Sequence, residues 1–121
     1  MINLDTYVLV RILSDALRSD ERVVLETESW SISAIVLWEI ERLHRSGILK
    51  YGLDDGAVRQ LLAGTRVWPI SPAVCLAMRQ LDFESDPADE LIAATSIAHN
   101  VPLLTRDSQI LASRVVPLAL K

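Results

Sequence analysis

Apolar residues recur along this chain at two spacings, which divide it into short strands and longer helices. Runs at 1–5, 29–33, 65–71 and 101–105 are apolar or alternate apolar with polar residues, as strands do. The segments between them repeat apolar residues every three to four positions, as helices do. Strands that alternate with helices over short connections predict an α/β domain of three layers, α/β/α, with a mainly parallel central sheet.

The same pattern sets the expected helices and the edges of the sheet. Helices are expected at 6–13, from about 20, at 34–46, 55–63, 72–81 and 86–100, followed by a helical turn at 109–113 and a last edge strand at 115–120. The helix from about 20 is expected to pack Val23, and the helix at 34–46 to bury Trp38. Pro69 moves the strand at 65–71 toward a sheet edge or an irregular end, because proline cannot donate to a strand ladder.

The stretch from Asp86 to Asp107 has the clearest signals for a helix that leads into a strand. Asp86 suits the N-cap, Pro87 suits the first helical position, and Asp89 falls in the first turn, where the helix dipole favours a negative charge. Asn100 tolerates the left-handed conformation that ends many helices. Ligands bind at the carboxyl ends of strands in open parallel sheets, so Asp89 and Asp107 are expected at one cleft.

Four carboxylates from distant parts of the chain are expected at that rim. Asp5 and Asp107 each follow a strand, Asp89 opens a helix, and Glu39 lies in a helix that follows a strand. Close together they would repel each other, and a divalent cation would relieve the repulsion. Oxygen ligands select Mg²⁺ or Mn²⁺, which can activate water for phosphodiester hydrolysis. The alternative for each acid alone is a local cap or a surface charge, and capping already explains the position of Asp86.

Four phrases of the sequence resemble a PIN domain in order and spacing, most closely the VapC-type toxins of bacterial toxin–antitoxin pairs. They are Leu4-Asp5-Thr6, Ser33 to Ile40, Asp86 to Ala94, and Leu104-Thr105-Arg106-Asp107. The likeness runs essentially from end to end, so a single PIN-like domain over 1–121 is expected. It implies an Mg²⁺- or Mn²⁺-dependent endoribonuclease that cuts RNA, forms a homodimer and is inhibited by a VapB-like antitoxin.

The resemblance also implies roles for particular residues. Asp5, Glu39, Asp89 and Asp107 would form the catalytic metal site, with Thr105, Thr6 and Asp86 as supporting residues. Arg106 is a candidate phosphate contact, and a plain surface role is the alternative. Tyr7 stands where the family commonly has Asn or His, so the hydrogen bonding or substrate contact beside the site is left open.

Composition narrows the function classes. The 12 Lys and Arg against 16 Asp and Glu give a net charge of −4, which argues against a broad basic face for nucleic acid but leaves a metal-loaded nuclease possible. The single cysteine, Cys75, is expected to be a buried thiol, and His44 and His99 lack zinc-type spacing. No apolar run approaches the ~20 residues of a membrane span, and a cytoplasmic location is expected.

Three other functions compete with an RNA-cutting enzyme. A DNA-directed nuclease could use the same acids, because nothing in the sequence reads a 2′-hydroxyl. A binding module that keeps the fold without catalysis fits the apolar content and the three tryptophans, Trp30, Trp38 and Trp68. A phosphate-accepting receiver domain fits poorly, because the two lysines, Lys50 and Lys121, do not follow a late strand as such a site needs.

Overall fold

The computed structural model describes residues 1 to 121, and strands alternate with helices along them. The strands are β1 (Ile2–Leu4), β2 (Trp30–Ser33), β3 (Arg66–Trp68) and β4 (Leu103–Leu104). The helices are α1 (Thr6–Leu13), α2 (Ser19–Thr27), α3 (Ala34–Arg45), α4 (Gly56–Ala63), α5 (Pro72–Ala77), α6 (Pro87–His99) and α7 (Ser108–Leu111), with a 3₁₀ turn, η1 (Met78–Gln80), after α5.

All four strands are parallel and stand in the order β3-β2-β1-β4. The chain leaves β1 toward β2 on one side, and it returns much later as β4 on the other side. The strand order therefore reverses between β1 and β4. In open parallel sheets the crevice outside the carboxyl ends of two such strands is where ligands bind.

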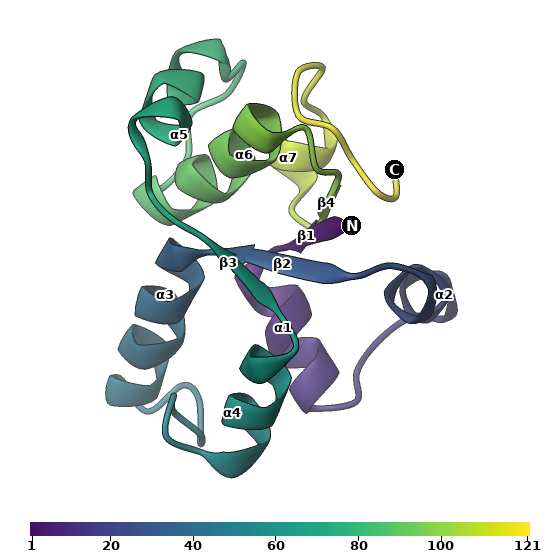
Figure 1. Ribbon diagram of the computed structural model, residues 1–121, viewed down its shortest axis with the longest axis vertical. Coiled ribbons are helices and arrows are strands. Elements are labelled where there is room, and N and C mark those ends of the chain that lie inside the picture. The colour runs from purple at the N-terminus through teal and green to yellow at the C-terminus, as the bar shows by residue number, and fades with distance from the viewer.

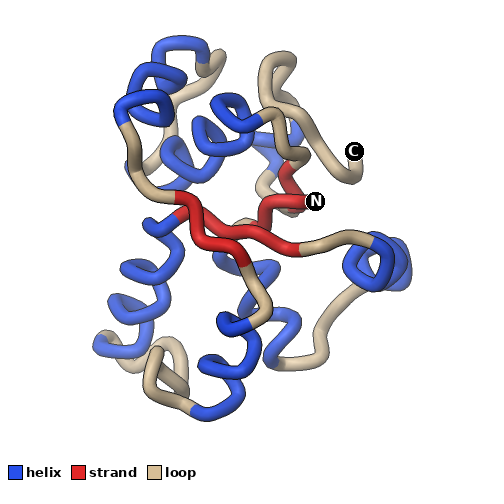
Figure 2. The backbone as a smooth tube through the Cα atoms, viewed as in Figure 1, coloured by secondary structure: helices blue, strands red, loops and turns tan.

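Helices cover both faces of this sheet, as the three-layer α/β/α prediction requires. Figure 1 shows α5, α6 and α7 on one face and α1, α3 and α4 on the other, and Figure 2 shows the strands as a thin band between the two groups. The main core lies between these layers, and its largest fully buried side chains are Ile2, Leu4, Leu9, Ile32, Ile40, Ile92, Leu103, Leu104 and Ile110.

Both ends of α6 follow the sequence prediction. The Asp86 carboxylate accepts a hydrogen bond from the Asp89 amide at 3.0 Å, and Pro87 occupies the first turn. Asn100 adopts the left-handed conformation, with φ of 51°. The small side chains of Ala93 and Ala94 are completely buried, which lets α6 lie close to its neighbours. The first turn of α6, which carries Asp89, is thus fixed locally by the Asp86 cap.

The predicted last strand at 115–120 is wrong. The segment forms only an isolated parallel bridge between Leu118 and Leu103, supported by hydrogen bonds from the Leu103 amide to the Pro117 carbonyl and from the Ala119 amide to the Leu103 carbonyl. Pro117 has no amide hydrogen to extend the ladder. The strand predicted at 65–71 narrows to β3 and lies at the sheet edge, as Pro69 indicated.

Three predictions of buried side chains are also wrong. Trp38 is 55% exposed, because Val36, Ile40 and Leu43 recur at the spacing that faces the core. Val23 is exposed on α2, and Cys75 is exposed on α5. None of the helices is long and apolar enough to cross a lipid bilayer.

Candidate functional site

Two predicted site residues meet where β1 and β4 end. The two strands are in register through Leu4 and Leu104, and the Asp5 amide donates to the Leu104 carbonyl at 3.1 Å. The Thr105 hydroxyl donates to Asp5 Oδ2 at 2.6 Å, which fixes the direction of that carboxylate. Asp5 is thus buried at the switch point of the sheet, with its side chain held by a residue a hundred positions away.

Asp107 is tied to the same loop and also begins α7. Its amide donates to Thr105 Oγ1 at 3.0 Å, and its Oδ1 accepts from the Gln109 and Ile110 amides at 2.9 and 3.0 Å. One carboxylate oxygen is therefore used as a helix cap, and no hydrogen bond within the chain uses the other. The capping role does not exclude a ligand role for Oδ2.

Glu39 and Asp89 come from helices on opposite sides of the sheet. Glu39 is buried on α3 and accepts a hydrogen bond from the Thr6 hydroxyl on α1. Asp89 lies in the first turn of α6, and its Oδ2 accepts from the Ser85 hydroxyl at 2.9 Å. Each of these acids is therefore oriented by a hydroxyl, in the way that Thr105 orients Asp5.

The four acids Asp5, Glu39, Asp89 and Asp107, here called the acid cluster, influence one another electrostatically. Burial raises the pKa of Asp5, and the negative charge of Asp107 raises it further. Burial also raises the pKa of Glu39, with added repulsion from Asp86 and Asp5. The pKa of Asp89 is raised to about 6 by burial and by the charges of Asp86, Asp5 and Asp107. The structure thus brings all four predicted acids into one region of shared negative charge.

The acid cluster fits a hard divalent cation in the chemistry of its ligands. Its donors are all carboxylate oxygens. Burial is the main cause that raises the pKa of Asp5, Glu39 and Asp89, and repulsion between carboxylates, which a cation would relieve, raises each further. No group of three or more His, Cys, Asp or Glu side chains lies close enough to hold an ion as the side chains stand. The acids therefore act on one another's pKa without converging on a single point.

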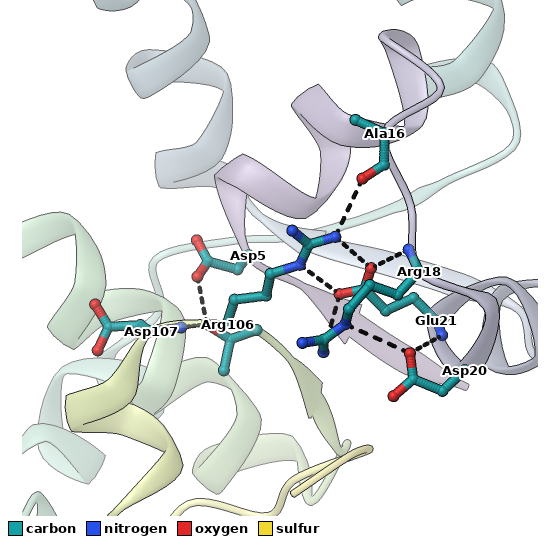
Figure 3. Close-up of polar contacts among 8 residues, drawn as sticks. Asp5, Ala16, Arg18, Asp20, Glu21, Arg106 and Asp107 are labelled. Atoms are coloured by element: carbon teal, nitrogen blue, oxygen red, sulfur yellow. Dashed lines mark hydrogen bonds and ion pairs between the residues drawn. The ribbon is translucent and has the colours of Figure 1, made fainter.

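The guanidinium of Arg106, the candidate phosphate contact, is bound to groups outside the acid cluster. Its Nη2 and Nε donate to the carboxylate of Glu21 at 2.6 and 2.8 Å, and Nη2 also donates to the Ala16 carbonyl at 3.1 Å. Figure 3 shows its guanidinium directed to Glu21 and Ala16, while Asp5 and Asp107 lie to the left of it with no contact drawn to the guanidinium. Glu21 has no exposed surface, so the arginine compensates a buried charge.

Sequence reasoning missed three residues around the site. Ser85, which binds Asp89, lies just before the Asp86 cap, where a search for helix signals stops. Glu21 is buried in a helix of low hydrophobicity, and no local signal marks it as a partner for a residue far along the chain. Arg11 lines a pocket of about 170 Å³ with Asp5, Tyr7, Arg106 and Asp107, and its spacing of four from Tyr7 could have revealed it.

Several solved structures have the same architecture, and one of them is a toxin–antitoxin complex. The complex of VapBC2 from Rickettsia felis, bound to a DNA fragment from its promoter, contains a chain 21% identical, with a TM-score of 0.75 and coverage of 98% of this chain and 97% of that one. FitAcB from Neisseria gonorrhoeae is 25% identical, with a TM-score of 0.71 and coverage of 98% and 96%. A toxin–antitoxin complex from Klebsiella pneumoniae is 23% identical, with a TM-score of 0.66 and coverage of 93% and 91%.

Family comparison agrees with the fold. No curated protein sequence matches the chain. The model of the PIN domain matches residues 2–115, which include every residue of the acid cluster. The resemblance seen in the sequence is thereby confirmed, and this chain belongs to the PIN domain family.

Proposed function

We propose that this chain is a divalent-metal-dependent endoribonuclease that acts as the toxin of a toxin–antitoxin pair. The observation that carries the proposal is the acid cluster beside the switch point of the sheet, where Asp5 and Asp107 line one pocket and the charge of Asp5 acts on both Glu39 and Asp89. PIN domains are typically nucleases, which supports hydrolysis of a phosphodiester bond at this rim.

The residues of the chain would orient the carboxylates for metal binding. Thr105 sets the angle of the Asp5 carboxylate, and Thr6 does the same for Glu39. Ser85 holds one oxygen of Asp89. Mg²⁺ or Mn²⁺, when bound, supplies an activated water and a counter-charge for the phosphate. Preorganised ligands of this kind lower the cost of arranging the site during the reaction.

A partner antitoxin is supported by the structural relatives. The similar chain from Klebsiella pneumoniae was solved in a toxin–antitoxin complex, and the similar chain from Rickettsia felis was solved in VapBC2 bound to a DNA fragment from its promoter. We propose a VapB-like antitoxin that offers a basic side chain to the acid cluster, together with a homodimer of this chain. Isolation of the native protein from its source as a lone monomer would count against both parts.

Cleavage of total RNA by purified protein tests the enzyme. With Mg²⁺ or Mn²⁺ we expect discrete fragments, which disappear with EDTA and in Asp5→Asn, a variant that keeps the side-chain volume and an acceptor for Thr105. The matched control is Asp54→Asn, which changes an exposed acid outside the acid cluster and should cut normally. A folded Asp5→Asn protein that cuts as fast as the wild type would overturn the assignment.

Parallel reactions with single-stranded DNA distinguish an RNA-cutting enzyme from a DNA-cutting one. Cleavage of RNA alone is the expected result. Cleavage of DNA alone would keep the acid cluster as the active site but replace the substrate. If the protein does not bind Mn²⁺ at the acid cluster and cuts neither RNA nor DNA, it would instead fit an interaction module without catalysis.

A further inference from the structure

A small pocket beside the acid cluster contains two side chains that the proposed reaction has not used. Its lining is formed by Asp5, Tyr7, Arg11, Arg106 and Asp107, and its volume is about 170 Å³. Tyr7 and Arg11 are four residues apart on α1, so both project from one side of that helix. The pocket therefore joins two acids of the cluster to an aromatic ring and a cation.

Arg11 is the free cation of this pocket. Arg106, the other arginine, has its guanidinium bound to the buried carboxylate of Glu21 and to the Ala16 carbonyl. None of the ion pairs of the structure includes Arg11, although Asp5 and Asp107 line the same pocket. A planar guanidinium with its donors available is well suited to a phosphate.

The side chain of Tyr7 is exposed to solvent and is not part of the core. Its side chain is 48% exposed, whereas Thr6, Val8 and Leu9 beside it on α1 are completely buried. The core therefore does not need the ring, and no hydrogen bond of the structure uses its hydroxyl. An exposed ring of this kind can stack on a nucleic-acid base that is not paired within a duplex.

We propose that Tyr7 and Arg11 form a nucleotide subsite of this site, in which Arg11 binds a phosphate and Tyr7 stacks on a base of single-stranded nucleic acid. The inference rests on the proposed function and adds how the strand is held next to the acid cluster. A nucleic acid offers a phosphate to Arg11 and a base to Tyr7. A basic peptide, drawn to Asp5 and Asp107, would instead meet the positive charge of Arg11.

Binding of labelled single-stranded oligonucleotides in EDTA tests the subsite without cleavage. Fluorescence anisotropy is measured over a series of salt concentrations, with one RNA and one DNA oligonucleotide of the same mixed sequence. Arg11→Ala should weaken binding and reduce the salt slope by about 0.7, the value for loss of one phosphate contact on a single strand. Tyr7→Ala should weaken binding about tenfold and leave that slope unchanged, whereas Tyr7→Phe should bind as the wild type does.

Arg45→Ala is the matched control, because this exposed arginine lies at the last turn of α3 and belongs to none of the ion pairs. It should change neither the affinity nor the slope. In cleavage reactions with Mn²⁺, Arg11→Ala and Tyr7→Ala should raise KM more than they lower kcat. Circular dichroism of each variant shows whether α1 and the fold are retained.

The outcomes separate this inference from the function on which it rests. Unchanged affinity and slope in folded Arg11→Ala and Tyr7→Ala would overturn the subsite, while metal-dependent cleavage by the same proteins would leave the proposed nuclease standing. A wild type that neither binds nor cuts either oligonucleotide would overturn both. Loss of binding to an arginine-rich peptide in Tyr7→Ala, with oligonucleotide binding intact, would assign the pocket to a protein partner and overturn the subsite.

Discussion

Replacing Glu21 with Gln should destabilise the protein in a way that depends strongly on pH. Glu21 is completely buried on α2, and its carboxylate binds Arg106 through two hydrogen bonds of 2.6 and 2.8 Å. It also accepts a hydrogen bond from the Arg18 amide at 2.8 Å. The Gln side chain has the same size and can still accept from Arg18, so the variant mainly removes the negative charge opposite Arg106.

The pKa of Glu21 gives the expected magnitude. The hydrogen bond from Arg106 is the main cause that lowers this pKa from 4.5 to about 2. At 1.36 kcal/mol per pKa unit, the ionised carboxylate adds about 3 kcal/mol to the free energy of unfolding. Because the pKa is lower in the folded state, this contribution is complete above pH 4.5 and is lost as the pH falls toward 2. The gap between wild type and Glu21→Gln should therefore be about 3 kcal/mol at pH 7 and should close in acid.

Urea unfolding of both proteins at pH 7, 5, 4 and 3 measures that gap. Glu26→Gln is the matched control, because it removes a negative charge from an exposed position of the same helix and should cost less than about 0.5 kcal/mol. A gap that stays constant from pH 7 to pH 3, or one that is absent at pH 7, would refute the claim that the ionised Glu21 is stabilised by Arg106.

Two further predictions concern the acid cluster and α3. The pKa of Asp89 is raised to about 6, so without metal the ionisation of this carboxyl opposes folding. Asp89→Asn should therefore raise the free energy of unfolding above pH 6 in EDTA, and this gain should vanish below pH 4. An equal gain at both pH values would contradict the prediction. In urea unfolding, Trp38→Ala should lower the free energy of unfolding by less than about 1 kcal/mol, because Trp38 is 55% exposed. Ile40→Ala, at a buried position of the same helix, should lower it by about 2–5 kcal/mol. A loss above about 1 kcal/mol for Trp38→Ala would contradict the exposed position of the tryptophan.

Site residues were predictable from the sequence where they stand at the end of a strand or in the first turn of a helix. Asp5 and Asp107 each follow an apolar strand, and Asp89 lies in the first turn of a helix whose cap and proline are evident in the sequence. A parallel sheet collects such positions at one edge, so their gathering follows from the predicted order of the elements. Their roles in metal binding and catalysis stay predictions that the Asp5→Asn experiment tests.

Side-chain partners and exposures were less predictable. Trp38 and Cys75 lie among apolar residues in the sequence, and yet both are exposed, because a helix buries only the positions that face its neighbours. Arg106 looks like a phosphate contact when it is read beside Asp107. The carboxylate that holds it, Glu21, is 85 residues away.

The sequence by itself determined the order of the strands β1 to β4 and the helices between them, the ends of α6 and the parallel sheet, because these depend on the spacing of apolar residues and on capping groups a few positions apart. The tertiary structure alone decided which side chains pair across the fold. It placed the Thr105 hydroxyl on Asp5, bound Arg106 to Glu21 and left Arg11 unpaired in the pocket. Such contacts join residues that are distant along the chain and depend on side-chain direction after packing, which no local pattern encodes.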